Sequence, residues 1–199
     1  MNAKIEQKER SHETILESAA SLLRARGISG ARVADVMKGA GLTVGGFYAH
    51  FASKAELIDE VMRRTGAELR ASLFARLDEK PAADRAIVVL KRYLSAKQRD
   101  RENDSGCPLP AVVGEVGTTA PEHHLVLGEM LAALAAGMEA QLPPAPTVIP
   151  RRQLALGLVA LMFGGLSLAR ALKGSELSDE LLRACRALGS FAVRRDANP

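Results

Sequence analysis

Side chains suited to contacting nucleic acid gather between Arg32 and Lys54. Thr43, Tyr48 and His50 carry groups that can hydrogen-bond phosphate oxygens. Lys54 adds a cation at the expected start of a helix, where exposed N–H groups favour an anion. Arg32 has the reach for a phosphate or for the edge of a guanine. We therefore expect this stretch to contact a nucleic acid.

The elements that position these side chains are two short helices joined by a tight turn. Apolar residues recur at helical spacing from Val33 to Ala40, and Gly41 ends this first helix. The second helix is expected from Val44 to His50, with the Thr43 side chain capping it and Phe47 facing the core. This pattern is typical of a helix-turn-helix, whose second helix fits the major groove of DNA.

The second helix should expose the positions that lie opposite Phe47. These predicted groove-facing positions are Val44, Gly45, Tyr48 and Ala49, with Gly46 near the turn. Gly45 and Gly46 would let the backbone approach the groove, and Val44 offers apolar contact to a thymine methyl group.

This region resembles the TetR family of bacterial transcriptional regulators. Three features match in order and spacing: an amphipathic helix ending at Arg26-Gly27, then VADVMKGAGLT, then GGFYAHFASKAEL. The resemblance implies an all-α chain with an N-terminal DNA-binding domain, residues 1–54, and a helical ligand-binding and dimerisation domain, residues 55–199. The resemblance also implies phosphate contacts at Thr43, Tyr48 and His50, because the family uses the matching positions in that way.

Two positions depart from the family pattern. Ala31 stands where members commonly carry Ser or Thr, so the first helix of the pair lacks its usual cap. Val44 stands where many members carry Lys or a polar residue, so sequence readout would depend on Arg32 and on DNA shape. Two alternatives are open, namely partial burial of Tyr48 in the core and a solvated or capping role for His50.

Composition agrees with a helical protein that binds DNA. The chain has 199 residues, of which 47% are hydrophobic and 25% charged, so it can bury a real core. A formal net charge of +4 permits nucleic-acid binding without proving it. Because residues 1–10 are polar and no uncharged apolar run is long enough to span a membrane, we expect a cytoplasmic protein without a membrane partner.

The sequence carries no motif of an enzyme or of a cofactor site. It contains no Gly-rich phosphate loop, no nucleophile elbow and no usefully spaced carboxylate pair. Glu122-His123-His124 suggests a metal cluster, but adjacent residues on a helix point in different directions. We therefore predict no catalysis, no cofactor and no metal.

Helical periodicity continues along the chain. Beyond the helix-turn-helix, the expected helices span about 10–27, 53–77 (opened by a capping box at Ser53 and Glu56), 82–101, 108–117, 121–138, 151–172 and 179–195. The helix at 151–172 is apolar over most of its surface and must be covered on two sides. The resemblance implies that the last two helices pair with those of a second subunit, and a two-fold homodimer favours a near-palindromic, double-stranded operator.

The second domain is expected to bind a small-molecule effector. Candidate wall residues, which are equally compatible with an ordinary core, are Phe74, Leu77, Tyr93, Leu94, Met130, Leu134, Met138 and Phe163. An apolar lining favours a hydrophobic or aromatic molecule. The family resemblance implies a repressor that is released when this effector binds the DNA-incompetent state more tightly.

Cys107 offers an alternative to reversible ligand binding. It lies at the expected start of a helix, where the helix dipole and exposed N–H groups favour the reactive thiolate. The chain would then be a regulator that senses oxidants or electrophiles. Cys185 lies on an expected buried stripe and is interpreted as a small apolar residue. A further alternative is a DNA-binding dimer that responds to no effector.

Overall fold

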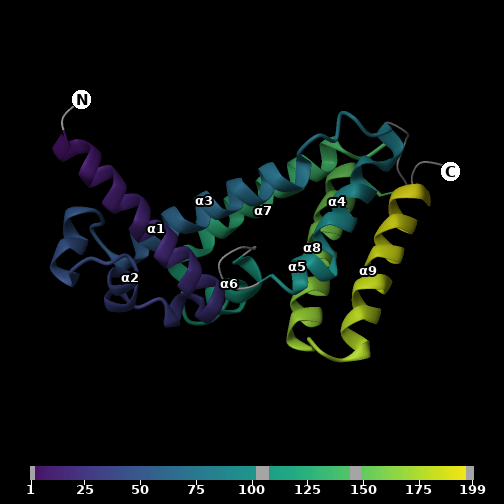
Figure 1. Cartoon of the computed structure of the whole chain (residues 1–199). Helices are drawn as coiled ribbons and strands as arrows, with labels where there is room; N and C mark the ends of the chain where they lie inside the picture. The colour runs from purple at the N-terminus through teal and green to yellow at the C-terminus, as the bar shows by residue number, and fades with distance from the viewer. Residues whose placement is uncertain (1–2, 102–107, 144–148, 196–199) are drawn as a thin grey trace. The chain divides into compact units, whose positions relative to one another are not determined.

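The computed structural model describes residues 3–101, 108–143 and 149–195, and every regular element in these ranges is a helix. The helices, drawn in Figure 1, are α1 (Ala3–Gly30), α2 (Val33–Gly39), η1 (Val44–Ala49), α3 (Lys54–Phe74), η2 (Ala82–Asp84), α4 (Arg85–Tyr93), α5 (Ala96–Arg99), α6 (Leu109–Val116), η3 (Pro121–His123), α7 (His124–Ala140), α8 (Arg151–Ala171) and α9 (Glu176–Arg195). The predicted all-α fold class is confirmed.

The described residues form two compact units. The first unit draws on Met1–Ala67 and Glu102–Gly128, and the second on Glu68–Arg101 and Glu129–Pro199. Packing therefore places residues 55–67 and α6 with the helix-turn-helix. The predicted boundary after residue 54 separates a DNA-binding from a ligand-binding function rather than two packed units, and it stays a prediction.

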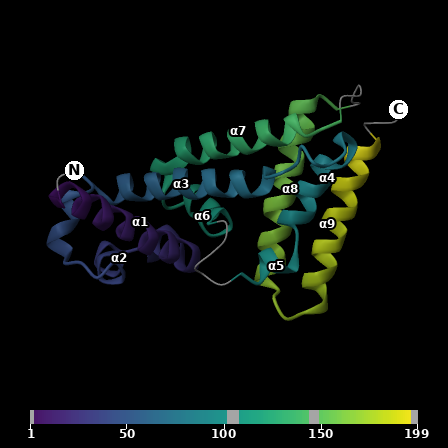
Figure 2. The same cartoon turned by 45° about the horizontal axis from the view of Figure 1, so that its top comes forward.

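In the first unit, α2 packs against α1 and η1 packs against α2. Figure 2 shows α1, α2 and α3 of this unit. Side chains from α1, α2, η1 and the start of α3 are buried in its apolar core. Among its fully buried side chains are Ile15, Leu23, Val36, Met37, Phe47, Phe51, Leu57 and Ile58. α1 begins at Ala3, well before the predicted start at Arg10, so the charged N-terminal stretch is helical. The helix was predicted to end at Gly27; it is interrupted there, where the φ of 68° lies in the left-handed region that glycine adopts without a Cβ clash, and it then continues to Gly30.

The short helix η1 differs from the prediction in two respects. η1 is a 3-10 helix, and the Thr43 side chain forms no capping hydrogen bond; only its carbonyl accepts, from the Gly46 N–H at 3.0 Å. The capping box before α3 is confirmed, because the Glu56 N–H donates to Ser53 Oγ at 3.1 Å. The Glu56 carboxylate reaches back to the Ala52 N–H at 2.6 Å. The entry into α3 is thus fixed by its own side chains.

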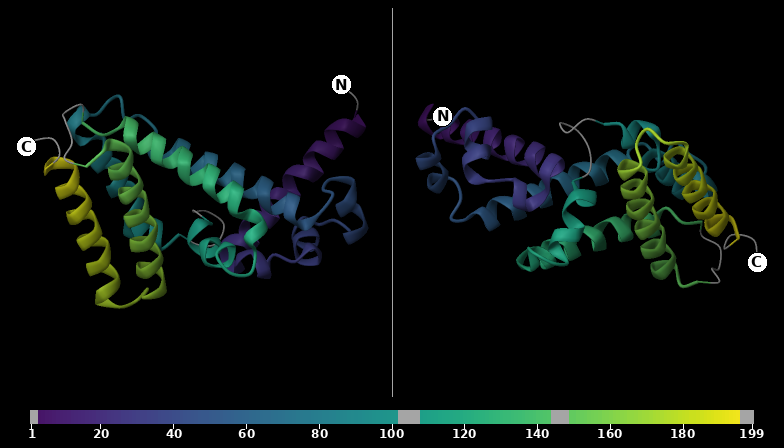
Figure 3. Two further views of the ribbon diagram at one scale, coloured as in Figure 1. Left: turned by 180° about the vertical axis from the view of Figure 1, so that it is seen from behind. Right: turned by 90° about the horizontal axis from the view of Figure 1, so that it is seen from below.

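In the second unit, α8 and α9 lie side by side, and α4 packs against both of them (Figure 3). The single helix predicted over 82–101 is instead η2, α4 and α5. The chain leaves the helical conformation at Leu94, where ψ is 60°, and Ser95 starts α5 by accepting a hydrogen bond from the Gln98 N–H at 3.2 Å. Ser95 is therefore a helix cap that the continuous apolar pattern concealed.

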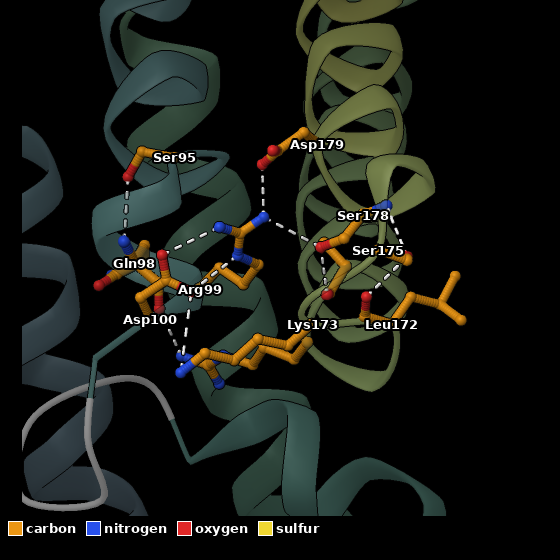
Figure 4. A network of polar contacts seen from close by, with 11 residues as sticks. Ser95, Gln98, Arg99, Asp100, Leu172, Lys173, Ser175, Ser178 and Asp179 are labelled. Carbon is orange, nitrogen blue, oxygen red and sulfur yellow. Dashed lines mark hydrogen bonds and ion pairs between the residues drawn. The ribbon is translucent and has the colours of Figure 1, made fainter.

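A polar network joins α5 to the first turn of α9 (Figure 4). The Arg99 guanidinium donates to Asp100 Oδ1 at 2.8 Å, to Ser178 Oγ at 3.0 Å and to the Asp179 carboxylate. Ser178 in turn donates to the Ala169 carbonyl at 2.6 Å. Hydrogen bonding to Arg99 lowers the pKa of Asp100. The network therefore fixes the start of α9 against the end of α8 and against α5.

α8 is long and apolar enough, by length and composition alone, to cross a membrane. However, 44% of the apolar window is buried inside the protein, including Leu158, Met162 and Leu166. The core helix of a globular protein meets the same criteria, and packing against α4 and α9 accounts for much of the apolar surface.

The close approach of α8 and α9 predicts the effect of Gly165→Ala. A Cβ at this position would lie 2.7 Å from Cys185 Sγ and 3.0 Å from Leu94 Cδ2, so these two packed side chains would have to move. We expect the free energy of unfolding, measured with urea, to fall by about 1–3 kcal/mol. Gly128→Ala, at a helical position with nothing within 4 Å, is the control and should be neutral or stabilising. Equal stability of Gly165→Ala and the wild type would contradict the packing.

Candidate nucleic-acid interface

The exposed face of η1 is the centre of the candidate interface. Phe47 is buried at 1% exposure, whereas Val44 is 50% and Tyr48 74% exposed. Gly45 and Ala49 are exposed on the same short helix. The predicted buried and exposed faces are confirmed, and partial burial of Tyr48 is not observed. The face offers an isopropyl group, a phenol and bare backbone.

Arg32 and Thr43 border this face. Arg32 is exposed and is the N-cap residue of α2, which has no side-chain cap, in agreement with the departure at Ala31. Thr43 is exposed and Gly46 is half-buried. The assignment of these residues to phosphates or base edges stays a prediction.

Lys54 has a structural contact that the sequence did not indicate. It is half-buried, and its ammonium donates to the Ile28 carbonyl at 2.7 Å. An ammonium has three N–H donors, so this bond does not exhaust its capacity. The predicted phosphate contact of Lys54 is thus compatible with a second role, in which the residue ties the start of α3 to the end of α1.

His50 is a half-buried residue beside a second histidine. Its ring lies 5.8 Å from the ring of His12, whose Nε2 is 2.8 Å from Glu60 Oε1. Within the described residues, the buried Nδ1 of His50 has no hydrogen-bond partner. Burial first, and then the neighbouring charges of His12 and Lys8, lower the pKa of His50. The environment therefore favours a neutral imidazole in the free protein.

Glu115, on α6, is an interface neighbour that sequence reasoning missed. Its carboxylate accepts hydrogen bonds from the N–H of Ile28 at 2.7 Å, from the N–H of Ser29 at 2.8 Å and from the Ser29 hydroxyl. Glu115 is 87 positions from Ile28 and 86 positions from Ser29 in the sequence, so no local pattern could indicate the contact. It holds the segment that leads from α1 to α2.

Comparison with known proteins agrees with this geometry. The family described as bacterial regulatory proteins, tetR family, matches residues 15–61. The curated HTH-type transcriptional repressor KstR2 of Mycobacterium tuberculosis is 45% identical over 49 residues, which are 25% of this chain and 24% of that protein. The match thus spans about a quarter of the length of this curated relative. Among solved structures, a TetR transcriptional regulator from Chloroflexus aurantiacus has a TM-score of 0.77 at 22% identity, covering 96% of this chain and 98% of that chain.

The helix-turn-helix of this chain belongs to the TetR family. The fold likeness extends over the second unit as well as the helix-turn-helix. RolR in complex with the ligand resorcinol has a TM-score of 0.55 at 16% identity, covering 98% of this chain and 97% of that chain.

The residues predicted to line a TetR-family ligand site lie in the second unit and are mostly core. Six of them are buried: Leu77, Tyr93, Leu94, Met130, Leu134 and Met138. Phe74 and Phe163 are half-buried, and the Phe163 ring stands edge-on to Tyr93 at 5.3 Å. The structure brings Tyr93 and Phe163 together. A ligand-binding role for the set stays a prediction.

The remaining candidates divide between undescribed and structural residues. Cys107 lies outside the described residues. His123 is buried, with its Nδ1 2.6 Å from Asp59 Oδ1, so it ties η3 to α3. Within the described ranges no cluster of metal-ligating side chains occurs. Cys185 is half-buried, and burial raises the pKa of its thiol.

The environment of His50 predicts a pH dependence of stability. Because the pKa of His50 is lowered on folding, the unfolded chain binds a proton more readily than the folded protein. The stability from this neutral histidine is complete above the ordinary pKa of 6.5 and is lost as the pH falls below it. We expect the free energy of unfolding to fall more steeply between about pH 7 and pH 5 for the wild type than for His50→Gln. Parallel urea-denaturation profiles for the two proteins would refute this account.

Proposed function

We propose that this TetR-family chain is a cytoplasmic transcriptional repressor that binds a near-palindromic DNA operator as a homodimer and is released by a small apolar molecule. The observation that carries the DNA-binding part is the exposed face of η1, where Val44 and Tyr48 project to solvent while Phe47 is buried. The family match over residues 15–61 covers this face. The exposed Arg32 and the half-buried Lys54 supply cations on its borders.

The exposed apolar surface of α8 and α9 supports the homodimer. Large apolar side chains exposed on these helices and their connection are Leu156, Leu168, Leu172, Leu177, Leu188 and Phe191. Gly157 and Gly164 on α8 have nothing within 4 Å of a Cβ position, so a second helix has room to approach. A two-fold dimer covers the same face on both chains with one interface. A dimer would also present paired reading units to the two halves of an operator.

The apolar interior of the second unit supports a small apolar or aromatic effector. Tyr93 and Phe163 supply aromatic faces, and Met130 and Met138 supply adaptable apolar ones. RolR, whose fold is similar, binds resorcinol. Release would follow if the effector binds the DNA-incompetent state more tightly than the DNA-bound state. Thiol sensing by Cys107 and effector-independent binding stay the alternatives.

Binding of Arg32→Ala to DNA tests the proposed reading surface. We expect the wild type to bind DNA from its own upstream intergenic region, and the variant to bind about 10-fold or more weakly with less discrimination at one base pair. An arginine on a guanine edge is worth about 1–3 kcal/mol. Fluorescence anisotropy at fixed salt, with a panel of single-base-pair changes, measures both effects.

Lys97→Ala is the matched control, because Lys97 is an exposed cation of the second unit. It should bind the operator as the wild type does. A uniform loss across the whole panel for Arg32→Ala would assign Arg32 to a phosphate. An unchanged affinity for Arg32→Ala would exclude Arg32 from the interface.

Leu188→Glu tests the dimer. Leu188 is 60% exposed on α9, so the substitution should not disturb the subunit core, but it would place a charge in the proposed apolar interface. We expect light scattering after size exclusion to give the mass of a dimer for the wild type and of a monomer for the variant. Leu125→Glu, at a 68% exposed leucine of the first unit, should remain dimeric. A dimeric Leu188→Glu variant would place the interface elsewhere.

A further inference from the structure

The peptide at Ile28 is held at both of its polar groups by distant side chains. Its N–H donates to Glu115 of α6 at 2.7 Å, and its carbonyl accepts from Lys54 of α3 at 2.7 Å. Glu115 also accepts from the N–H and the hydroxyl of Ser29. All of these groups belong to the first unit. The end of α1 is thus fixed between α6 and α3.

The Glu115 carboxylate fits closely against Gly27. A Cβ at Gly27 would overlap Glu115 Oε1 and would lie 3.3 Å from the Ala111 carbonyl, also on α6. Only a residue without a side chain leaves this room, and the positive φ of Gly27 turns the following N–H groups toward the carboxylate's side of the chain. The site is therefore shaped for the side chain that occupies it.

The ionised form of Glu115 suits this arrangement. Burial alone would raise its pKa, but the hydrogen bonds from Ser29 and Ile28, together with the charge of Lys54, outweigh burial and lower the pKa. A carboxylate accepts several N–H and O–H groups at once, and such charge-assisted hydrogen bonds are the strong ones.

Hydrogen bonds carry this anchoring forward to the reading surface. The Ala31 N–H donates to the Ile28 carbonyl at 3.3 Å, and the Arg32 N–H donates to the Gly30 carbonyl at 3.0 Å. Arg32 is the N-cap residue of α2. A shift of the backbone at Ile28 therefore shifts the origin of α2 and the exposed Arg32 side chain.

We propose that Glu115 is a positioning residue for DNA reading, which holds the Ile28–Ser29 backbone and thereby sets the place of Arg32 and α2 relative to α1. This inference rests on the proposed DNA-binding function. It gives α6 a role in operator recognition through Glu115, without contact between that residue and DNA.

Glu115→Gln tests the role with little change in size. The amide replaces one acceptor oxygen with a donor that faces backbone N–H groups. We expect operator affinity to fall about 10-fold, because charge-assisted hydrogen bonds at the junction are lost. Affinity for unrelated DNA of the same length should hold, since non-specific binding depends on the cations that face phosphates. Anisotropy titrations with both DNAs at one salt concentration give the specificity ratio.

Glu17→Gln is the matched control, because Glu17 is an exposed carboxylate of α1 and its loss changes the net charge equally. It should keep the wild-type specificity ratio. Ser29→Ala removes only one of the donors and should give a smaller loss than Glu115→Gln. In amide hydrogen exchange, Ile28 and Ser29 should exchange faster in Glu115→Gln while the core of the first unit keeps its protection.

Three outcomes would overturn the positioning role. The first is that Glu115→Gln and Glu17→Gln have the same ratio of operator affinity to affinity for unrelated DNA. The second is a proportional loss of operator and non-specific affinity together with early thermal unfolding, which would mean that the contact only supports the fold. The third is unchanged exchange at Ile28 and Ser29. If the wild type instead binds the operator no more tightly than unrelated DNA, the proposed function itself is contradicted. The wild-type titration alone decides this point.

Discussion

Burial of Phe47 is the interaction on which the exposed face of η1, the proposed DNA-reading surface, depends. η1 has six residues, too few for a helix to be stable in water by its own hydrogen bonds. The Phe47 ring lies 5.6 Å from the ring of Phe51 and is almost completely buried. Full burial of a phenylalanine contributes about 1.5–3 kcal/mol, more than a single net hydrogen bond. Once Phe47 is docked, helical geometry turns the adjacent Tyr48 outward, whereas Val44 is exposed as the first residue of η1.

The second short helix is placed by polar contacts as well as by its buried residues. Val36 and Met37 bury the inner side of α2, but its first turn has no side-chain cap. Its start is fixed through the backbone from Ile28, which Glu115 and Lys54 hold. Backbone groups near buried surfaces must find partners, and here distant side chains supply them. The two halves of the helix-turn-helix are therefore secured by different physical means.

Local patterns explain what the sequence predicted well. Helical apolar spacing, the glycine at Gly27 and the capping box at Ser53 and Glu56 act over a few residues, and the structure confirms each of them. The break before Ser95 was missed because Tyr93 and Leu94 are both buried, so the apolar pattern runs on through the end of α4. The spacing of apolar residues indicates which positions are buried, and buried positions continue across the point where one helix ends and the next begins.

Contacts between distant residues could not be predicted in this way. Glu115 carries no local signal, since its partners lie on α1, and Lys54 fits a phosphate contact equally well without its bond to Ile28. The exposure of Tyr48 was predictable because it follows from helical geometry beside the buried Phe47. The residues predicted to line a ligand site share an apolar helical spacing. Packed cores and ligand cavities both have this spacing, so it cannot distinguish a core residue from a cavity residue.

The first unit is discontinuous in sequence, and this affects the order in which it is completed during synthesis. A growing chain emerges from its N-terminus and folds as it emerges. The helix-turn-helix residues therefore leave the ribosome long before α6, with all of 68–101 in between. Until Glu115 emerges, the N–H groups of Ile28 and Ser29 lack the carboxylate that holds them in the finished protein. A chain broken off before α6 would carry every residue predicted to face the groove and still lack the carboxylate that holds the chain before α2.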